Sequence, residues 1–388
     1  MDSLKLNQFQ SYFDEQTGDK LTLWFGQHVF TVDGILVSLN NVPLLRNENT
    51  GEVHLPDKTK HMIKYFVEEA KKHKKPGIFL TPKALDTKRY NFADKFDFIY
   101  SQIDYEYIPG LMRSWNEGFL TPVFFNLSVL NKYSQNPDYT LDLFSETYGS
   151  IWRGQDWHIA FGINKNNKVI MWLGDIDSLP DSEKYYLRSE NLPSDHDIHS
   201  EFYEAQIDVQ WSEASKQSTL FHLRKSLNDA VRQSINFDLY MLEGEVSKVI
   251  SNLHRPVFWE DKHVGPVIES FNRIFVESLN SKAIKDDIKS ISASADIKNK
   301  GSLKLFELWI ELRQKLANTK DIACPFYVLY DFRIITCHLQ SEESKFDTLK
   351  SINSRLGLTE DNTSYEIIYD ALISSLSNSY RTMIDSNI

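Results

Sequence analysis

Arg333 and His338 are the two side chains of this chain whose types and spacing point most clearly to chemistry. Four residues separate them in an otherwise apolar run, residues 326–339. A buried charge is costly unless it is paired with an opposite charge or used. The pair is therefore either a catalytic site or a neutralised structural pair, in which Arg333 contacts an acid such as Asp331 or Glu307 and His338 lies at the boundary of the core.

A helix over residues 325–339 must position these side chains. Pro325 suits the first turn of a helix, because that turn needs no donor from its N–H. At about 100° per residue, Arg333 and His338 project about 140° apart, so they do not share one face. Asp331 lies about 20° from the face of His338, where it can orient the imidazole or hold the arginine.

The same Arg-x4-His spacing resembles the motif of the HEPN family of ribonucleases. The resemblance covers residues 255–388, where we expect four helices with the motif on the third. It implies a homodimer in which two motif helices face each other, and cleavage of RNA without metal or cofactor. In that comparison His338 is the general acid or base and Arg333 holds the phosphate. Asp331, which helix geometry places near His338, completes the candidate catalytic set.

One residue departs from the family pattern. Many HEPN proteins carry a polar residue, often Asn, directly after the arginine, and this chain has Ile334 there. A degenerate, dimerising version of the domain therefore stays open. The alternative function is a non-catalytic scaffold or partner-binding protein. For the ribonuclease, the family resemblance suggests a role in bacterial phage defence or a toxin system, with a protein trigger that acts on the N-terminal region.

A second group of candidate residues lies in a polar segment. Residues 194–201 read Ser-Asp-His-Asp-Ile-His-Ser-Glu, and Asp175 and Asp177 precede them. Histidines and carboxylates at this density can bind a divalent metal, which would make the protein a metal-dependent hydrolase. The same acids can instead cap a helix that begins near Glu201.

The chain divides into a mixed α/β part and a helical part, so we expect an α+β protein. We predict a mixed domain over residues 1–211, connecting helices over 212–254 and the HEPN-like helical domain over 255–388. In the first part, residues 57–74 have helical periodicity, and two β-rich runs flank the Asn-rich turn at 164–167, which predicts a hairpin. We expect loops at 175–201 and 281–302 and a strand at 204–211. We find no internal repeat.

Charge and composition limit the partners. The chain has a net charge of −11; residues 1–254 carry 26 basic and 35 acidic side chains, whereas residues 255–388 carry 17 and 19. Any contact with RNA is therefore local and easier in the C-terminal part. Two cysteines, no signal-peptide pattern and no long apolar run predict a cytoplasmic protein that does not insert into a membrane. Residues 124–133, 172–180 and 186–191 resemble segments of uncharacterised bacterial proteins.

Overall fold

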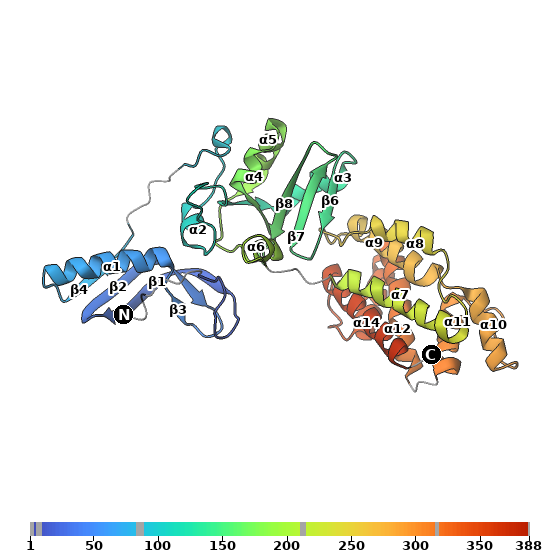
Figure 1. Cartoon of the computed structure of the whole chain (residues 1–388). Coiled ribbons are helices and arrows are strands. Elements are labelled where there is room, and N and C mark those ends of the chain that lie inside the picture. Colours follow the sequence, from blue (N-terminus) through green and yellow to red (C-terminus); the bar gives the residue numbers. More distant parts are fainter. Residues whose placement is uncertain (1–3, 5–9, 83–88, 210–214, 315–317, 387–388) are drawn as a thin grey trace. The chain divides into compact units, whose positions relative to one another are not determined.

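The computed structural model describes residues 4, 10–82, 89–209, 215–314 and 318–386. It consists of two compact units, residues 1–213 and 214–388. The first unit holds both β-sheets and the second is helical, so the expected α+β class is confirmed (Figure 1). Connecting helices were predicted over residues 212–254; the described part of that range, from residue 215 on, belongs to the helical unit, where α7 (Lys216–Ile235) packs against α14 (Tyr365–Asp385).

The first sheet is built around one long strand, β2. Strand β1 pairs with it antiparallel along one edge, and the short strands β3 and β4 share the other edge. Helix α1 lies along the sheet (Figure 1), and Ile63 and Val67 of the helix are buried in the same core as Val37 and Leu39. The bounds of these elements are β1 (Leu21–Val32), β2 (Ile35–Asn47), β3 (Val53–His54), α1 (Asp57–Lys72) and β4 (Gly77–Leu80).

The second sheet has six antiparallel strands in the order β10-β5-β9-β8-β7-β6. Strands β5 and β9 are almost entirely apolar and buried, whereas the outer strand β6 is largely half-buried. The predicted hairpin is present as β8 and β9, joined by a turn in which Asn167 adopts a left-handed backbone. The strands are β5 (Pro122–Asn126), β6 (Thr140–Leu143), β7 (Tyr148–Arg153), β8 (Trp157–Ile163), β9 (Lys168–Trp172) and β10 (Asn191–Leu192).

Short helices accompany this sheet, and two of the sequence predictions were wrong here. The expected loop at 175–201 contains two helices and β10, and the expected strand at 204–211 begins as a helix, with residues 210 and 211 outside the described residues. Residues 204–206, at the start of the expected strand, are instead the last residues of a helix that buries Phe202 and Tyr203. The helices are α2 (Gln102–Tyr107), α3 (Leu130–Gln135), α4 (Leu173–Asp177), α5 (Asp181–Glu190) and α6 (Glu201–Gln206).

The C-terminal unit packs its helices around one hydrophobic core that includes Trp309, Phe326 and Tyr380. Among the described residues from 255 onwards there are six α-helices, with α12 the fourth, so the expected arrangement of four helices with the motif on the third was wrong. Residues 281–291, predicted as loop, form α10. The remaining helices are α8 (Glu243–Ser251), α9 (Asp261–Asn272) followed by a π-helical turn (Arg273–Glu277), α10 (Ser281–Ile291), α11 (Ser302–Gln314), α12 (Thr319–Cys337) and α13 (Glu342–Leu356).

Within the described residues, no helix has the combination of length and apolar character that a transmembrane segment needs.

Candidate functional site

The Arg333–His338 motif lies on and just beyond helix α12, with its charged members engaged within the helical unit. Arg333 forms an ion pair with Glu269 of α9. Asp331 accepts a hydrogen bond of 2.5 Å from Arg355 of α13, so it holds neither Arg333 nor His338. His338 caps the end of the helix with an extended backbone and is exposed. Pro325 is inside the helix rather than in its first turn.

The predicted polar segment 194–201 forms a different and more closely organised site. Three of its side chains accept hydrogen bonds from the backbone N–H two residues further on: Ser194 from His196, Asp195 from Asp197, and Asp197 from His199. These local contacts stabilise an irregular backbone, in which His196 has a left-handed φ of 64°. A helix does begin at Glu201, as one interpretation of the sequence predicted, but its cap is Ser200 rather than one of the acids.

His196 is fixed by a carboxylate from a distant part of the chain. Asp104 of α2 is fully buried, and its Oδ1 lies 2.5 Å from Nδ1 of His196. Because a carboxylate only accepts, Nδ1 of His196 carries the proton in this contact. The other oxygen of Asp104 accepts a hydrogen bond of 2.5 Å from the hydroxyl of Ser194. Both oxygens of Asp104 are therefore used to hold one segment, and Nε2 is the imidazole nitrogen left for a ligand.

His196 lines an open pocket of about 380 Å³ within the N-terminal unit. Its side chain is 31% exposed, so the ring is held at Nδ1 by Asp104 and remains accessible from the pocket. The pocket walls come from β1, the end of β2, the turn between β8 and β9, and the segment 195–197. The lining residues are Thr22, Leu23, Trp24, Arg46, Glu48, Lys165, Asn166, Asp195, His196 and Asp197.

Two neighbouring residues that line the pocket, His196 and Asp197, have titratable side chains with opposite roles. The hydrogen bond to Asp104 raises the pKa of His196 above its ordinary value, which favours the imidazolium. Burial raises the pKa of Asp197, which makes its carboxylate a better base. Its Oδ2 is buried without a hydrogen bond, and the nearest cation, Lys165, is 3.7 Å away. An acid and a base thus line one pocket.

The remaining charged side chains of the pocket differ in how firmly they are held by hydrogen bonds and ion pairs within the protein. Asp195 is held by Asn164, Asn166 and Lys168, which makes it part of the framework. Lys165 is largely exposed and only loosely paired, at 3.6 Å from Glu48.

Arg46 lies over the ring of Trp24, with 5.4 Å from its guanidinium carbon to the ring centroid. This places a cation and an aromatic face together at the wall of the pocket.

The sequence indicated part of this site. Its density of His and Asp marked residues 194–201, although for metal rather than for acid–base chemistry. Within the described residues, the group of His and carboxylate side chains close enough to bind a metal lies elsewhere, so the structure does not bring the 175–201 residues together as ligands. Asp104 carried no sequence signal, because it lies 92 residues before His196.

No family model, curated protein or solved structure matches this chain. The resemblance to HEPN ribonucleases therefore rests on the short Arg-x4-His motif.

Proposed function

We propose that this chain cleaves RNA without a catalytic metal, by acid–base chemistry in the pocket of the N-terminal unit. The observation that carries the proposal is the contact between the buried carboxylate of Asp104 and Nδ1 of His196. This contact fixes the tautomer and orientation of the imidazole and raises its pKa. A histidine held in this way, with its other nitrogen toward an open pocket, suits a general acid.

RNA fits the chemistry of the pocket because it brings its own nucleophile. Asp197 accepts the proton of the 2′-hydroxyl as that oxygen attacks the adjacent phosphorus, and His196 gives a proton to the departing 5′-oxygen. Arg46 and Lys165 stabilise the charge that develops on the phosphate, and Trp24 offers a face for a base to stack on. The products end in a 2′,3′-cyclic phosphate.

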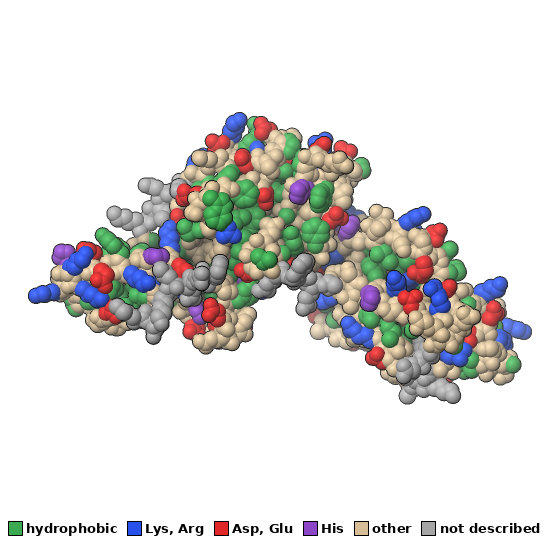
Figure 2. Space-filling view, in the orientation of Figure 1, with side chains coloured by type: hydrophobic (Ala, Val, Ile, Leu, Met, Phe, Trp, Pro, Cys, Tyr) green, Lys and Arg blue, Asp and Glu red, His purple; other side chains and the backbone are tan. Residues whose placement is uncertain are grey.

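The distribution of charge agrees with a local contact to RNA. Basic and acidic side chains are interspersed on the visible face of both units (Figure 2), and the whole chain is acidic. A protein that coats nucleic acid uses a broad basic surface. Here binding depends on a few groups in the pocket, which favours short, single-stranded segments that can enter it.

The test is cleavage of a labelled RNA by the full chain in excess chelator, compared with the variant His196→Asn. Asparagine tolerates the left-handed backbone and can still donate to Asp104, so the turn is preserved while the imidazole is lost. We expect a rate loss of roughly 10²–10⁴. The control is His338→Ala, which keeps full cleavage. The reverse result, with loss only in the His338 variant, would move the active site to the helical unit.

Asp104 is a positioning residue in this proposal, and its test is a pH profile. Because Asp104 raises the pKa of His196, the imidazolium persists to higher pH in the native protein. Asp104→Asn removes that stabilisation, so the alkaline limb of the pH–rate profile moves to lower pH. A uniform loss of rate with an unchanged limb would indicate a structural role alone.

For the helical unit we propose a non-catalytic role, as a surface for a second copy or another protein. The observation that favours this role is that Arg333 and Asp331 are both ion-paired inside the unit. The expected homodimer across these helices is part of the same proposal. Light scattering of the full chain tests it: a monomer at tens of micromolar would contradict self-association. Retained RNA cleavage by Arg333→Ala would separate the helical unit from the chemistry.

A further inference from the structure

Two six-residue turns with matching sequences face each other at one end of the first sheet. Residues 14–19 read Asp-Glu-Gln-Thr-Gly-Asp, and residues 47–52 read Asn-Glu-Asn-Thr-Gly-Glu. In each, the glycine N–H donates to the carbonyl of the first residue at 2.8 Å, and φ at Gly18 and Gly51 is 75° and 76°. The similarity is too short to be recognised as a repeat from the sequence alone. It matters because the two turns contact each other in the structure.

Buried amide contacts join the two turns. Asn47 is fully buried and donates to Oδ2 of Asp14 at 2.9 Å and to Oδ2 of Asp19 at 3.0 Å. Asn49 donates to the other oxygen of Asp19. The first turn is thereby held against the second turn, which connects β2 to β3.

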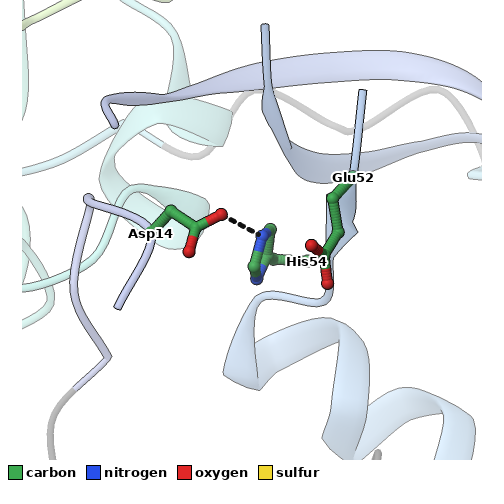
Figure 3. Close-up of side chains that lie close together, drawn as sticks. All are labelled: Asp14, Glu52 and His54. Carbon is green, nitrogen blue, oxygen red and sulfur yellow. Dashed lines mark ion pairs between the residues drawn. The ribbon is translucent and has the colours of Figure 1, made fainter. Parts of the chain in front are cut away.

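This pairing brings three side chains with metal-binding atoms together (Figure 3). Asp14 belongs to the first turn, Glu52 ends the second, and His54 follows on β3. One donor atom from each lies within 4.8 Å of the other two. Figure 3 shows the carboxylates of Asp14 and Glu52 on either side of the imidazole.

The imidazole of His54 has an unsatisfied nitrogen in this cluster. Nε2 of His54 is buried and makes no hydrogen bond, and it lies 3.4 Å from Oδ2 of Asp14. Ordinary N–H···O contacts are about 2.7–3.2 Å. By contrast, two ligands of a tetrahedral zinc ion, each about 2.0–2.1 Å from the metal, are separated by about 3.3–3.4 Å. The gap is therefore the right size for two ligands and too long for a good hydrogen bond.

Asp14 retains the lone pair and the charge that a metal ligand needs. Its Oδ1 accepts the backbone N–H groups of Gln16 and Thr17, and its Oδ2 accepts from Asn47. A carboxylate has about four lone-pair positions, so one on Oδ2 is left over. An aspartate is ionised near neutral pH, so the group also carries the negative charge that a metal ligand needs.

We propose that Asp14, Glu52 and His54 bind a divalent transition-metal ion of the Zn²⁺ class, which ties the N-terminal turn to the end of the sheet. An imidazole nitrogen with two carboxylate oxygens suits Zn²⁺ better than Mg²⁺ or Ca²⁺, which take oxygen ligands. Three protein ligands leave a fourth position for water. The ion is structural here, so its removal lowers the melting temperature and leaves the chemistry of His196 in place.

The experiment is calorimetric titration of the chelator-treated full chain with ZnCl₂. We expect one zinc ion per chain at this site, and a rise in melting temperature on binding. His54→Gln removes the imidazole and should abolish both effects. Glu52→Gln changes an exposed residue with no risk to folding and should weaken binding at least about tenfold, since an anionic ligand is lost. The matched control is His61→Gln, an exposed histidine of α1 outside the cluster.

Co²⁺ provides a second readout of the ligands. Bound to nitrogen and oxygen, it gives weak visible d–d bands, whereas a cysteine ligand adds an intense charge-transfer band. We expect only the d–d bands, and their loss in His54→Gln. Three results would overturn the proposal: no zinc uptake by the native chain, equal uptake by folded His54→Gln, or a thiolate band that places the ion at Cys324 or Cys337.

Discussion

At the scale of single residues, His196 combines an unfavourable backbone with a fixed imidazole. A left-handed conformation at a residue other than glycine costs of order 1–3 kcal/mol and persists only when neighbouring contacts determine it. Here Ser194 accepts the backbone N–H of His196 while its hydroxyl donates to Asp104, which also holds the ring. One buried carboxylate thus sets both the backbone and the side chain, which explains why the strain lies at the pocket.

His199, three residues further on, should make the protein sensitive to acid. It stacks on Tyr12 at 4.1 Å and donates from Nε2 to the carbonyl of Leu21 at 2.6 Å. Burial lowers its pKa from 6.5 to about 4. Between those values the unfolded chain binds a proton that the folded protein does not, so stability is lost as pH falls through this window. We expect His199 to contribute about 2–3 kcal/mol to the loss between pH 7.5 and 4.5.

The measurement is urea unfolding of the native chain and of His199→Gln at both pH values. Glutamine can still donate to the carbonyl of Leu21 but does not titrate. Its loss of stability toward acid should be smaller by that amount, because carboxylates titrate equally in both proteins. Parallel curves for the two proteins would show that His199 does not drive the acid sensitivity.

The parts of the candidate sites that could be predicted are those in which the contacting residues lie close together in the sequence. The local contacts of residues 194–200 follow from Ser and Asp side chains, which cap nearby N–H groups, and the sequence marked this segment. Asp104, Arg46 and Glu269 act through partners far away in the chain, and no local pattern distinguishes them from ordinary surface charges. The motif at Arg333 shows the same limit, since the acid that pairs with it is on another helix.

At the scale of elements, helices α9 and α12 pack closely because one residue between them has no side chain. A Cβ added at Gly265 of α9 would lie 2.9 Å from the carbonyl oxygen of Thr336 on α12. The thiol of Cys337 also donates to the carbonyl of Gly265 at 3.3 Å. The end of α12, where the Arg-x4-His motif lies, is therefore positioned by backbone contact.

Gly265→Ala should destabilise the helical unit by about 1–3 kcal/mol, since a backbone carbonyl cannot move aside as a flexible side chain can. Gly244→Ala is the matched control: Gly244 lies in α8 with open space around its Cβ position. There alanine should stabilise by roughly 0.5–1 kcal/mol, through its better helix propensity. Thermal melts of the two variants should therefore shift in opposite directions. Equal small shifts would contradict the close packing.

Elements with a continuous apolar pattern were predicted well, and polar ones were not. Helix α1 and the hairpin β8–β9 lie where the periodicity and the Asn-rich turn placed them. Helix α10 was missed because only Ile284 and Ile288 are buried among many Lys, Asp and Ser residues. Two buried residues four positions apart suffice for a helix when Asn280 caps its start. They are too few, however, to produce a recognisable helical pattern in a segment that is otherwise polar.

At the scale of the whole molecule, the two units have separate hydrophobic interiors. Among the residues that the structure describes, the core around Trp309 and Phe326 consists of residues from 220 onwards, and the core of the first sheet consists of residues before 81. The charge is also divided, because most of the net negative charge lies before residue 255. In the proposed function, chemistry and the structural metal belong to the N-terminal unit, whereas assembly belongs to the helical unit.

Separate cores predict that the full chain unfolds in two steps, since each unit can lose its packing without exposing the interior of the other. Scanning calorimetry should resolve two transitions, each responding to its own substitutions. Gly265→Ala should lower only the transition of the helical unit, and His54→Gln in the presence of zinc should lower only that of the N-terminal unit. A single transition that both substitutions displace together would mean that the units fold as one cooperative body, and the division of roles between them would lose its physical basis.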